Sequence, residues 1–202
     1  MSLISRKAIL VVALAATAAA TDRRTFTFTP PGFQKGEGPS LEVSVDIDVD
    51  NGRLLNVIGP NLRTPADAAI AVLETALSAN YHDSVDEILS IWSPEERAAT
   101  RLVLQDEAKR AKNATLFHSF QEFRLLARLH YGKFVVFLTA ERYLNGEWRA
   151  AFYPFKREGP ALYMTNDLRT DPLIFMVAAE VGKQQLYDLL RAKPELGIRD
   201  KK

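Results

Sequence analysis

The sequence predicts an α+β protein, in which N-terminal helices pack on a curved antiparallel meander sheet. A β-hairpin leader precedes the helices, and a C-terminal helix follows the sheet. Three observations carry this prediction. Segments of alternating polarity separated by tight-turn residues lie between positions 121 and 165. Apolar residues recur with helical spacing between positions 64 and 115, and again after position 171.

The late alternating segments predict a four-stranded meander. In the first of them, one face carries Phe123, Leu125, Ala127, Leu129 and Tyr131, and the other carries Arg124, Leu126, Arg128 and His130. Asn145-Gly146 predicts a type I′ hairpin, because both residues tolerate positive φ. The predicted strands are Gln121–Tyr131, Phe134–Tyr143, Trp148–Phe155 and Ala161–Thr165.

Residues 21–63 are predicted to form a β-rich extension. Thr25–Thr29 and Leu41–Val49 alternate in polarity, whereas glycines and a proline predict a loop over Gln34–Ser40. Asn51-Gly52 predicts another hairpin, with a return strand along Arg53–Ile58.

Three carboxylates at every second position of this extension, Asp46, Asp48 and Asp50, suggest a calcium loop. The match is incomplete, because Asn51 stands where the sharp-turn glycine belongs and Val57 where the bidentate glutamate belongs. A strand with its acidic side in water explains the same residues and is preferred.

Helices follow the extension. Thr64 is the expected N-cap and Pro65 the first helical residue of a helix that runs to Leu77. A short second helix carries Val85, Ile88, Leu89 and Trp92. Ser93-Pro94-Glu95-Glu96 is a capping box that predicts a third helix to Thr115, with inward side chains at Ala99, Leu102, Val103 and Ala108.

A last helix is expected to begin at Asp171-Pro172. Gly182 is a candidate break in it, and Pro194 ends it. Residues 193–202 are expected to form a flexible tail.

The first 20 residues have the pattern of a signal peptide. Arg6 and Lys7 precede an apolar run of 13 residues, and Ala18-Ala19-Ala20 supplies a cleavage site after Ala20. A membrane anchor is the alternative, but a spanning helix needs roughly 20 apolar residues. The chain has no cysteine, which for an exported protein favours the bacterial periplasm.

Charge excludes some partners. The full chain has 26 Lys and Arg and 25 Asp and Glu, a net charge of +1, and removal of residues 1–20 takes away two cations and leaves −1. A near-neutral chain has no general attraction for nucleic acid or for an anionic membrane, so neither is expected as a partner of the mature form.

The order of elements resembles the NTF2-like superfamily. The residues that carry the resemblance are Pro65–Leu77, Asn80-Tyr81-His82-Asp83, Ile88–Glu96, Phe134–Tyr143 and Trp148–Phe155. It implies a cone over residues 64–192, with a pocket lined by the first helices and by inward residues of the meander. Members include isomerases, dehydratases and non-catalytic binding domains, and many pair through the sheet. The C-terminal helix is a departure from the family order.

Candidate catalytic residues are few. Among the three histidines, no pair has the i, i+4 spacing of a metal site, and no cofactor or metal motif is found. His118 and His82 are weak candidates for a catalytic base, which would need a carboxylate partner inside the cavity. A structural role is the preferred interpretation of all three histidines.

Aromatic residues gather in the predicted cone. A packed core is their preferred interpretation, and the wall of a ligand cavity is the alternative. The candidates for ligand contact are Tyr81, Trp92, Phe117, Phe137, Trp148 and Tyr153.

Three functional hypotheses follow. The preferred one is a non-catalytic periplasmic binding or accessory module for a small apolar ligand or a protein partner. The second is a cofactor-independent isomerase or dehydratase that uses a pocket histidine. The third is a structural homodimer subunit. An enzyme needs a histidine and a carboxylate that meet in a cavity, a binding module needs a roomy cavity, and a structural subunit needs a filled cone.

Overall fold

A computed structural model describes residues 21–28, 41–59 and 67–197 of the chain. These residues form an α+β fold around one six-stranded antiparallel sheet, in which the strands lie in sequence order. The strands are β1 (Thr21–Phe28), β2 (Leu41–Leu54), β3 (Phe120–Tyr131), β4 (Phe134–Tyr143), β5 (Trp148–Glu158) and β6 (Ala161–Met164). The predicted α+β class and the four-stranded meander are therefore confirmed, and β1 and β2 extend the same sheet.

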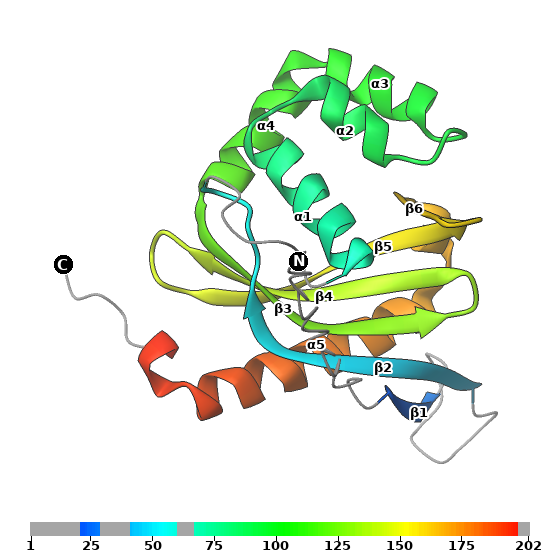
Figure 1. The fold of residues 1–202 in the computed structure, drawn as a ribbon, viewed down its shortest axis with the longest axis vertical. Coiled ribbons are helices and arrows are strands. Elements are labelled where there is room, and N and C mark those ends of the chain that lie inside the picture. Colours follow the sequence, from blue (N-terminus) through cyan, green and yellow to red (C-terminus); the bar gives the residue numbers. More distant parts are fainter. Residues whose placement is uncertain (1–20, 29–40, 60–66, 198–202) are drawn as a thin grey trace, which may run out of the picture.

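The predicted hairpin at Asn51-Gly52 is wrong. Strand β2 continues through both residues without a chain reversal, and their φ values are 52° and 70°. The pairing of β2 with β3 shifts register between Val49 and Arg53, so these two residues form a β-bulge. The bulge bends β2, so that it follows the curvature of the sheet (Figure 1). The predicted loop 34–40 lies outside the described residues.

A second bulge corrects the predicted faces of β3. The register against β4 shifts between Leu125 and Ala127, so the alternation changes phase at Leu126. Phe123 and Leu125 pack under the N-terminal helices, whereas Ala127 and Leu129 pack on the opposite face of the sheet. The sequence pattern alone placed all four on one face.

Four helices lie on one side of the sheet, as Figure 1 shows. They are α1 (Ala68–Tyr81), α2 (Val85–Ile91), α3 (Arg97–Gln105) and α4 (Glu107–His118). The N-cap of α1 is Asp67, whose Oδ1 accepts a hydrogen bond from the Ile70 amide at 2.8 Å. The helix therefore begins later than predicted, and Thr64 and Pro65 lie outside the described residues.

The predicted third helix is broken in two at Asp106, whose side chain caps α4 by accepting from the Lys109 amide at 3.1 Å. Its capping box is present in altered form, because Ser93 Oγ donates to Glu96 Oε2 at 2.8 Å while α3 begins only at Arg97. Ala99, Leu102, Val103 and Ala108 are exposed instead of inward. The break rotates the two halves relative to each other and leaves Leu104 as the buried residue of α3.

The opposite face of the sheet is covered by α5 (Pro172–Ala192), drawn in orange to red in Figure 1. Pro172 occupies the first turn, and Asp171 accepts hydrogen bonds from the Leu173 and Ile174 amides at 3.1 and 3.3 Å. Gly182 is buried inside α5 and does not divide it. Short 3₁₀ helices lie at Asp167–Thr170 and Pro194–Gly197, so part of the predicted tail is ordered.

The sheet consequently separates two apolar cores. The core under α5 contains Val45, Ile47, Leu129, Leu138 and Val177, among others. The core under the N-terminal helices contains Leu73, Leu77, Phe123, Phe137 and Phe155. None of the helices in the described ranges combines the length and the apolar character needed to cross a bilayer.

Candidate functional site

A cavity of about 440 Å³ lies within the helical layer. Residues of all four N-terminal helices and of the α2–α3 connection line it: Asn80, Ile88, Trp92, Thr100, Val103, Leu104, Lys109, Arg110, Lys112, Asn113 and Leu116. Its volume falls in the range of small-molecule sites, about 300–1,000 Å³. The cavity is open on one side and its wall is mostly apolar.

The inner wall of the cavity belongs to a small core of its own. Ile88 and Leu104 are buried there with Ala79 and Leu89, and Trp92 packs against them. Trp92 follows the last turn of α2 and pairs with Met164 of β6, so the helical layer is fixed to the sheet edge at this point. The apolar wall is therefore attached to the edge of the sheet at β6.

An amide pair closes the cavity between α1 and α4. Asn113 Nδ2 donates to Asn80 Oδ1 at 3.0 Å, and Asn80 Nδ2 donates to the Ala76 carbonyl at 2.8 Å. This pair joins α1 and α4, which also meet where His118 contacts Tyr81. Amide groups beside an apolar wall are typical of sites that orient a ligand.

Three cations of α4 border the cavity. Lys109 pairs with Asp106 at 3.0 Å, and Arg110 pairs with Asp83 at 3.1 Å. Lys112 has no ion pair or hydrogen bond with the other residues of the described ranges. The apolar wall and the unpaired ammonium group together fit a ligand that has an apolar body and an anionic head.

The structure separates the six predicted aromatic contacts. Trp92 lines the cavity. Tyr81, Phe117, Phe137 and Tyr153 pack in the core between the helices and the sheet. Trp148 is not brought together with them. It packs on the α5 side, where its Nε1 donates to the Leu196 carbonyl at 2.8 Å.

The candidate histidines have backbone and ring contacts. His118 Nε2 lies 2.8 Å from the Tyr81 carbonyl oxygen, and the Tyr81 ring packs edge-on against both His82 and His118. Within the described ranges, neither His82 nor His118 has a carboxylate within hydrogen-bond distance. The dyad that an enzyme would need is not formed by these two side chains.

A buried carboxyl group lies on the helix-facing side of β4. Glu141 is only 4% exposed and accepts hydrogen bonds from the hydroxyl groups of Tyr153 and Thr139. Burial raises the pKa of Glu141 despite these two bonds. Burial and the neighbouring Glu141 carboxyl raise the pKa of the Tyr153 phenol well above its usual value. Neither residue lines the cavity in the helical layer.

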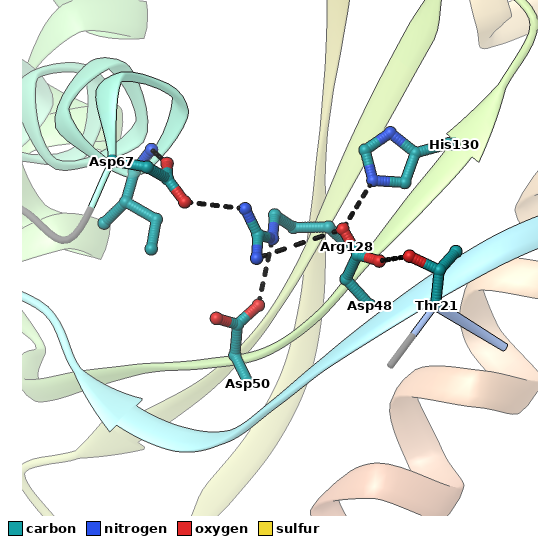
Figure 2. Close-up of polar contacts among 7 residues, drawn as sticks. Thr21, Asp48, Asp50, Asp67, Arg128 and His130 are labelled. Atoms are coloured by element: carbon teal, nitrogen blue, oxygen red, sulfur yellow. Dashed lines mark hydrogen bonds and ion pairs between the residues drawn. The ribbon is translucent and has the colours of Figure 1, made fainter. Parts of the chain in front are cut away.

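A second polar cluster joins β2, β3 and the start of α1 (Figure 2). Arg128 donates from Nε to Asp50 Oδ2 at 3.1 Å and from Nη1 to Asp67 Oδ2 at 2.8 Å. Asp48 lies 3.9 Å from the same guanidinium group and 2.9 Å from His130 Nε2. The prediction of an acidic strand side in water is therefore wrong for Asp48 and Asp50.

The environment moves the pKa values of these two carboxyl groups in opposite directions. Burial raises the pKa of Asp50, more than Arg128 lowers it. Burial also acts to raise the pKa of Asp48, but hydrogen bonds from Thr21 and His130 outweigh it and lower that pKa. The cluster fixes the first turn of α1 to the sheet, because Asp67 is both the N-cap of α1 and a partner of Arg128.

Of the residues at these two sites, sequence reasoning proposed only Trp92 as a ligand contact, and it missed the Arg128 cluster. The cluster had a usable signal, since acids at alternate positions of β2 match cations at alternate positions of β3. The cavity had none, because it depends on the break at Asp106.

Comparison of the chain with protein-family models, with curated proteins and with solved structures gives no significant match. Function is therefore inferred from the geometry of this chain.

Proposed function

We propose that this protein is a non-catalytic binding module that holds a small amphipathic ligand, with an apolar body and an anionic head, in its helical layer. The single observation that carries the proposal is the cavity of about 440 Å³ between the four N-terminal helices. The apolar body would lie against Ile88, Trp92 and Leu104, and the head would lie at Lys112.

Two features of the cavity support binding over catalysis. Among the described residues, the titratable groups that line it are three cations, and two of these are already paired with aspartates. A general base needs a group that accepts a proton near neutral pH, and within residues 21–28, 41–59 and 67–197 no carboxylate or histidine lines the cavity. The enzymatic alternative would have to use Glu141, which lies elsewhere in the helix-facing core.

The wider assignment belongs to the same proposal. Helices over one face of a curved sheet agree with an NTF2-like cone, and residues 1–20 agree with export to the periplasm, although they lie outside the described residues. The homodimer alternative would need a surface other than the outer sheet face, because α5 already packs there.

A titration with two amphiphiles of equal chain length tests the proposal. Isothermal titration calorimetry of the full chain should show saturable binding of decanoate and much weaker binding of decyltrimethylammonium. Native mass spectrometry of protein purified from the periplasm should also show a retained small molecule. Absence of saturable decanoate binding, or equal affinity for the two amphiphiles, would contradict the proposed ligand.

Variants place the ligand in the cavity. Val103→Trp fills it and should abolish binding. Lys112→Gln should weaken decanoate about fivefold, which corresponds to about 1 kcal/mol for a partly exposed charge pair. Lys183→Gln removes an exposed cation from α5 and is the matched control, which should leave the affinity unchanged. Equal losses at Lys112 and Lys183 would place the ligand elsewhere.

A further inference from the structure

The outward face of α3 is apolar. Residues at positions i, i+1, i+4 and i+5 lie on one side of a helix, and in α3 these are Ala98, Ala99, Leu102 and Val103. All four are exposed, with Leu102 at 70% and Val103 at 50%. A surface helix of a globular protein normally turns such a face to the core, so this face lacks a partner among the residues that the structure describes.

The apolar face continues across the cavity. Val103 and Leu116 both line the cavity, and Leu116 on α4 is 47% exposed. The exposed side chains of α3 and the cavity wall therefore form one surface, here called the α3–α4 apex and defined by Ala98, Ala99, Leu102, Val103 and Leu116. Figure 1 shows α3 at the end of the molecule farthest from α5.

The apex is positively charged although the whole chain is nearly neutral. Residues 97–118 contain five Lys and Arg and two Asp and Glu, a net charge of +3, whereas the full chain carries +1. The remainder of the chain is therefore at −2. Arg101 and Lys112 make no ion pair within the described ranges, so their charges are available to a partner.

These charges favour an anionic partner over a second copy of the chain. A two-fold contact between two apices would bring two groups of cations together, which is unfavourable. Protein interfaces concentrate their binding energy in Trp, Tyr and Arg, whereas the apolar face of α3 carries only Ala, Leu and Val. Aliphatic side chains flanked by Lys and Arg are typical of helices that lie in the surface of an anionic bilayer.

We propose that the α3–α4 apex docks on an anionic phospholipid surface, with Leu102 and Val103 in the headgroup boundary and Arg101 and Lys112 at the lipid phosphates. In this position the cavity opens beside the lipid. The bilayer is then the source of the amphipathic ligand. Only this origin of the ligand rests on the proposed function. The near-neutral net charge of the whole chain does not indicate this docking surface, because the electrostatic attraction to lipid comes from residues 97–118 alone.

A single label tests the docking directly. The chain has no cysteine, so Leu102→Cys can carry one environment-sensitive fluorophore. Tyr187→Cys on α5 is the matched control, because Tyr187 is 62% exposed and lies on the other side of the sheet. The full chain is mixed with vesicles of phosphatidylcholine alone or with phosphatidylglycerol added, and in a further arm with polyglutamate. No ligand is present, so failure here is distinct from failure of decanoate binding.

The expected result is a blue shift at position 102, and none at position 187, with vesicles that contain phosphatidylglycerol. Arg101→Gln and Lys112→Gln should each lower the vesicle partition coefficient about fivefold. Leu102→Asp should abolish the partition that depends on phosphatidylglycerol and leave decanoate binding intact, because Leu102 does not line the cavity. No shift at position 102, or equal shifts at both positions, overturns the proposal. A shift with polyglutamate and none with vesicles would assign the apex to an acidic protein instead.

Discussion

At the scale of single residues, Arg128 determines how β2, β3 and α1 meet. Its guanidinium group contacts three carboxylates, two from β2 and one from the N-cap of α1, and the Asp50 side chain among them is only 4% exposed. A buried carboxylate without its counter-charge is far less favourable than one in water. Arg128 therefore stabilises the fold mainly because it compensates the negative charge of the buried Asp50 carboxylate.

Removal of Arg128 tests this role. Arg128→Ala should lower the free energy of unfolding by about 3–5 kcal/mol, because it leaves Asp50 buried and unpaired. Arg23→Ala is the control, since Arg23 is 76% exposed and 3.9 Å from Asp46, and it should cost less than about 1 kcal/mol. Urea unfolding followed by circular dichroism measures both. Similar midpoints for the two variants would show that the cluster contributes little.

A second prediction at this scale concerns Glu141 and pH. Burial raises its pKa, so the folded state holds the proton more tightly than the unfolded state. The contribution of Glu141 to stability is therefore complete below the unfolded pKa and is lost as pH rises through the folded pKa.

Glu141→Gln should remove this dependence. The amide side chain of this variant still accepts the Tyr153 hydrogen bond without carrying a charge, so the variant should match the native protein at pH 4 and exceed it in unfolding free energy at pH 8. Urea midpoints measured from pH 4 to pH 8 give the comparison. Glu147→Gln, at an exposed carboxylate, is the control, and its urea midpoint should change with pH in the same way as that of the native protein. A variant less stable than the native protein at pH 8 would mean that the ionised carboxylate is favoured in the core.

At the scale of elements, two breaks in regular pairing decide the geometry. The bulge at Asn51-Gly52 bends β2, and the capped break at Asp106 separates α3 from α4. Both breaks depend on local backbone conformations, and both change which side chains face the interior.

The bulge gives a prediction for Gly52. Its φ of +70° disfavours any side chain, and a Cβ there would overlap Leu189 of α5. Gly52→Ala should therefore lower the free energy of unfolding by roughly 1–3 kcal/mol. Gly132→Ala shares a positive φ of 59° but has open space around its Cβ, so it should cost less. The melting temperatures of the two variants distinguish the steric overlap with Leu189, which only Gly52→Ala has, from the backbone strain that both variants share. Equal losses would leave backbone strain as the whole effect.

At the scale of the whole molecule, the sheet is covered on both faces and depends on both covers. On one side α5 buries Ile174, Val177, Ala178 and Val181 against strands from both halves of the sheet. The N-terminal helices bury the other side. Loss of either cover would expose a large apolar surface to water.

Neighbouring positions of α5 test this dependence. Val177→Asp places a charge at a fully buried site and should prevent stable folding, because burial of an unpaired carboxylate costs several kcal/mol. Met176→Asp changes the adjacent residue, which is 47% exposed, and should be tolerated within about 1 kcal/mol. The soluble yield and the circular dichroism spectrum of each variant show whether it folds. A folded Val177→Asp protein would show that α5 is dispensable for the sheet.

Prediction from the sequence succeeded where the signal is local. The four meander strands, the α5 start at Asp171-Pro172 and the α+β class follow from alternation, turn residues and capping. Prediction failed at Asn51-Gly52, because the same positive φ serves a hairpin or a bulge, and only the pairing of β2 with β3 distinguishes them. It failed at Leu102 and Val103, which were predicted to face inward. The helix is interrupted at the single residue Asp106, and the resulting short helix α3 turns these two side chains to the outside.

The amino-acid sequence by itself determined which segments are strands and which are helices, since hydrophobic period, capping and turn chemistry act over a few neighbouring residues. Only the tertiary structure decided that Arg128 would gather three aspartates and that four helices would leave a cavity beside Lys112. Both arrangements bring together residues far apart in the chain. Their formation depends on bulges and breaks whose effect is set by packing across the whole sheet.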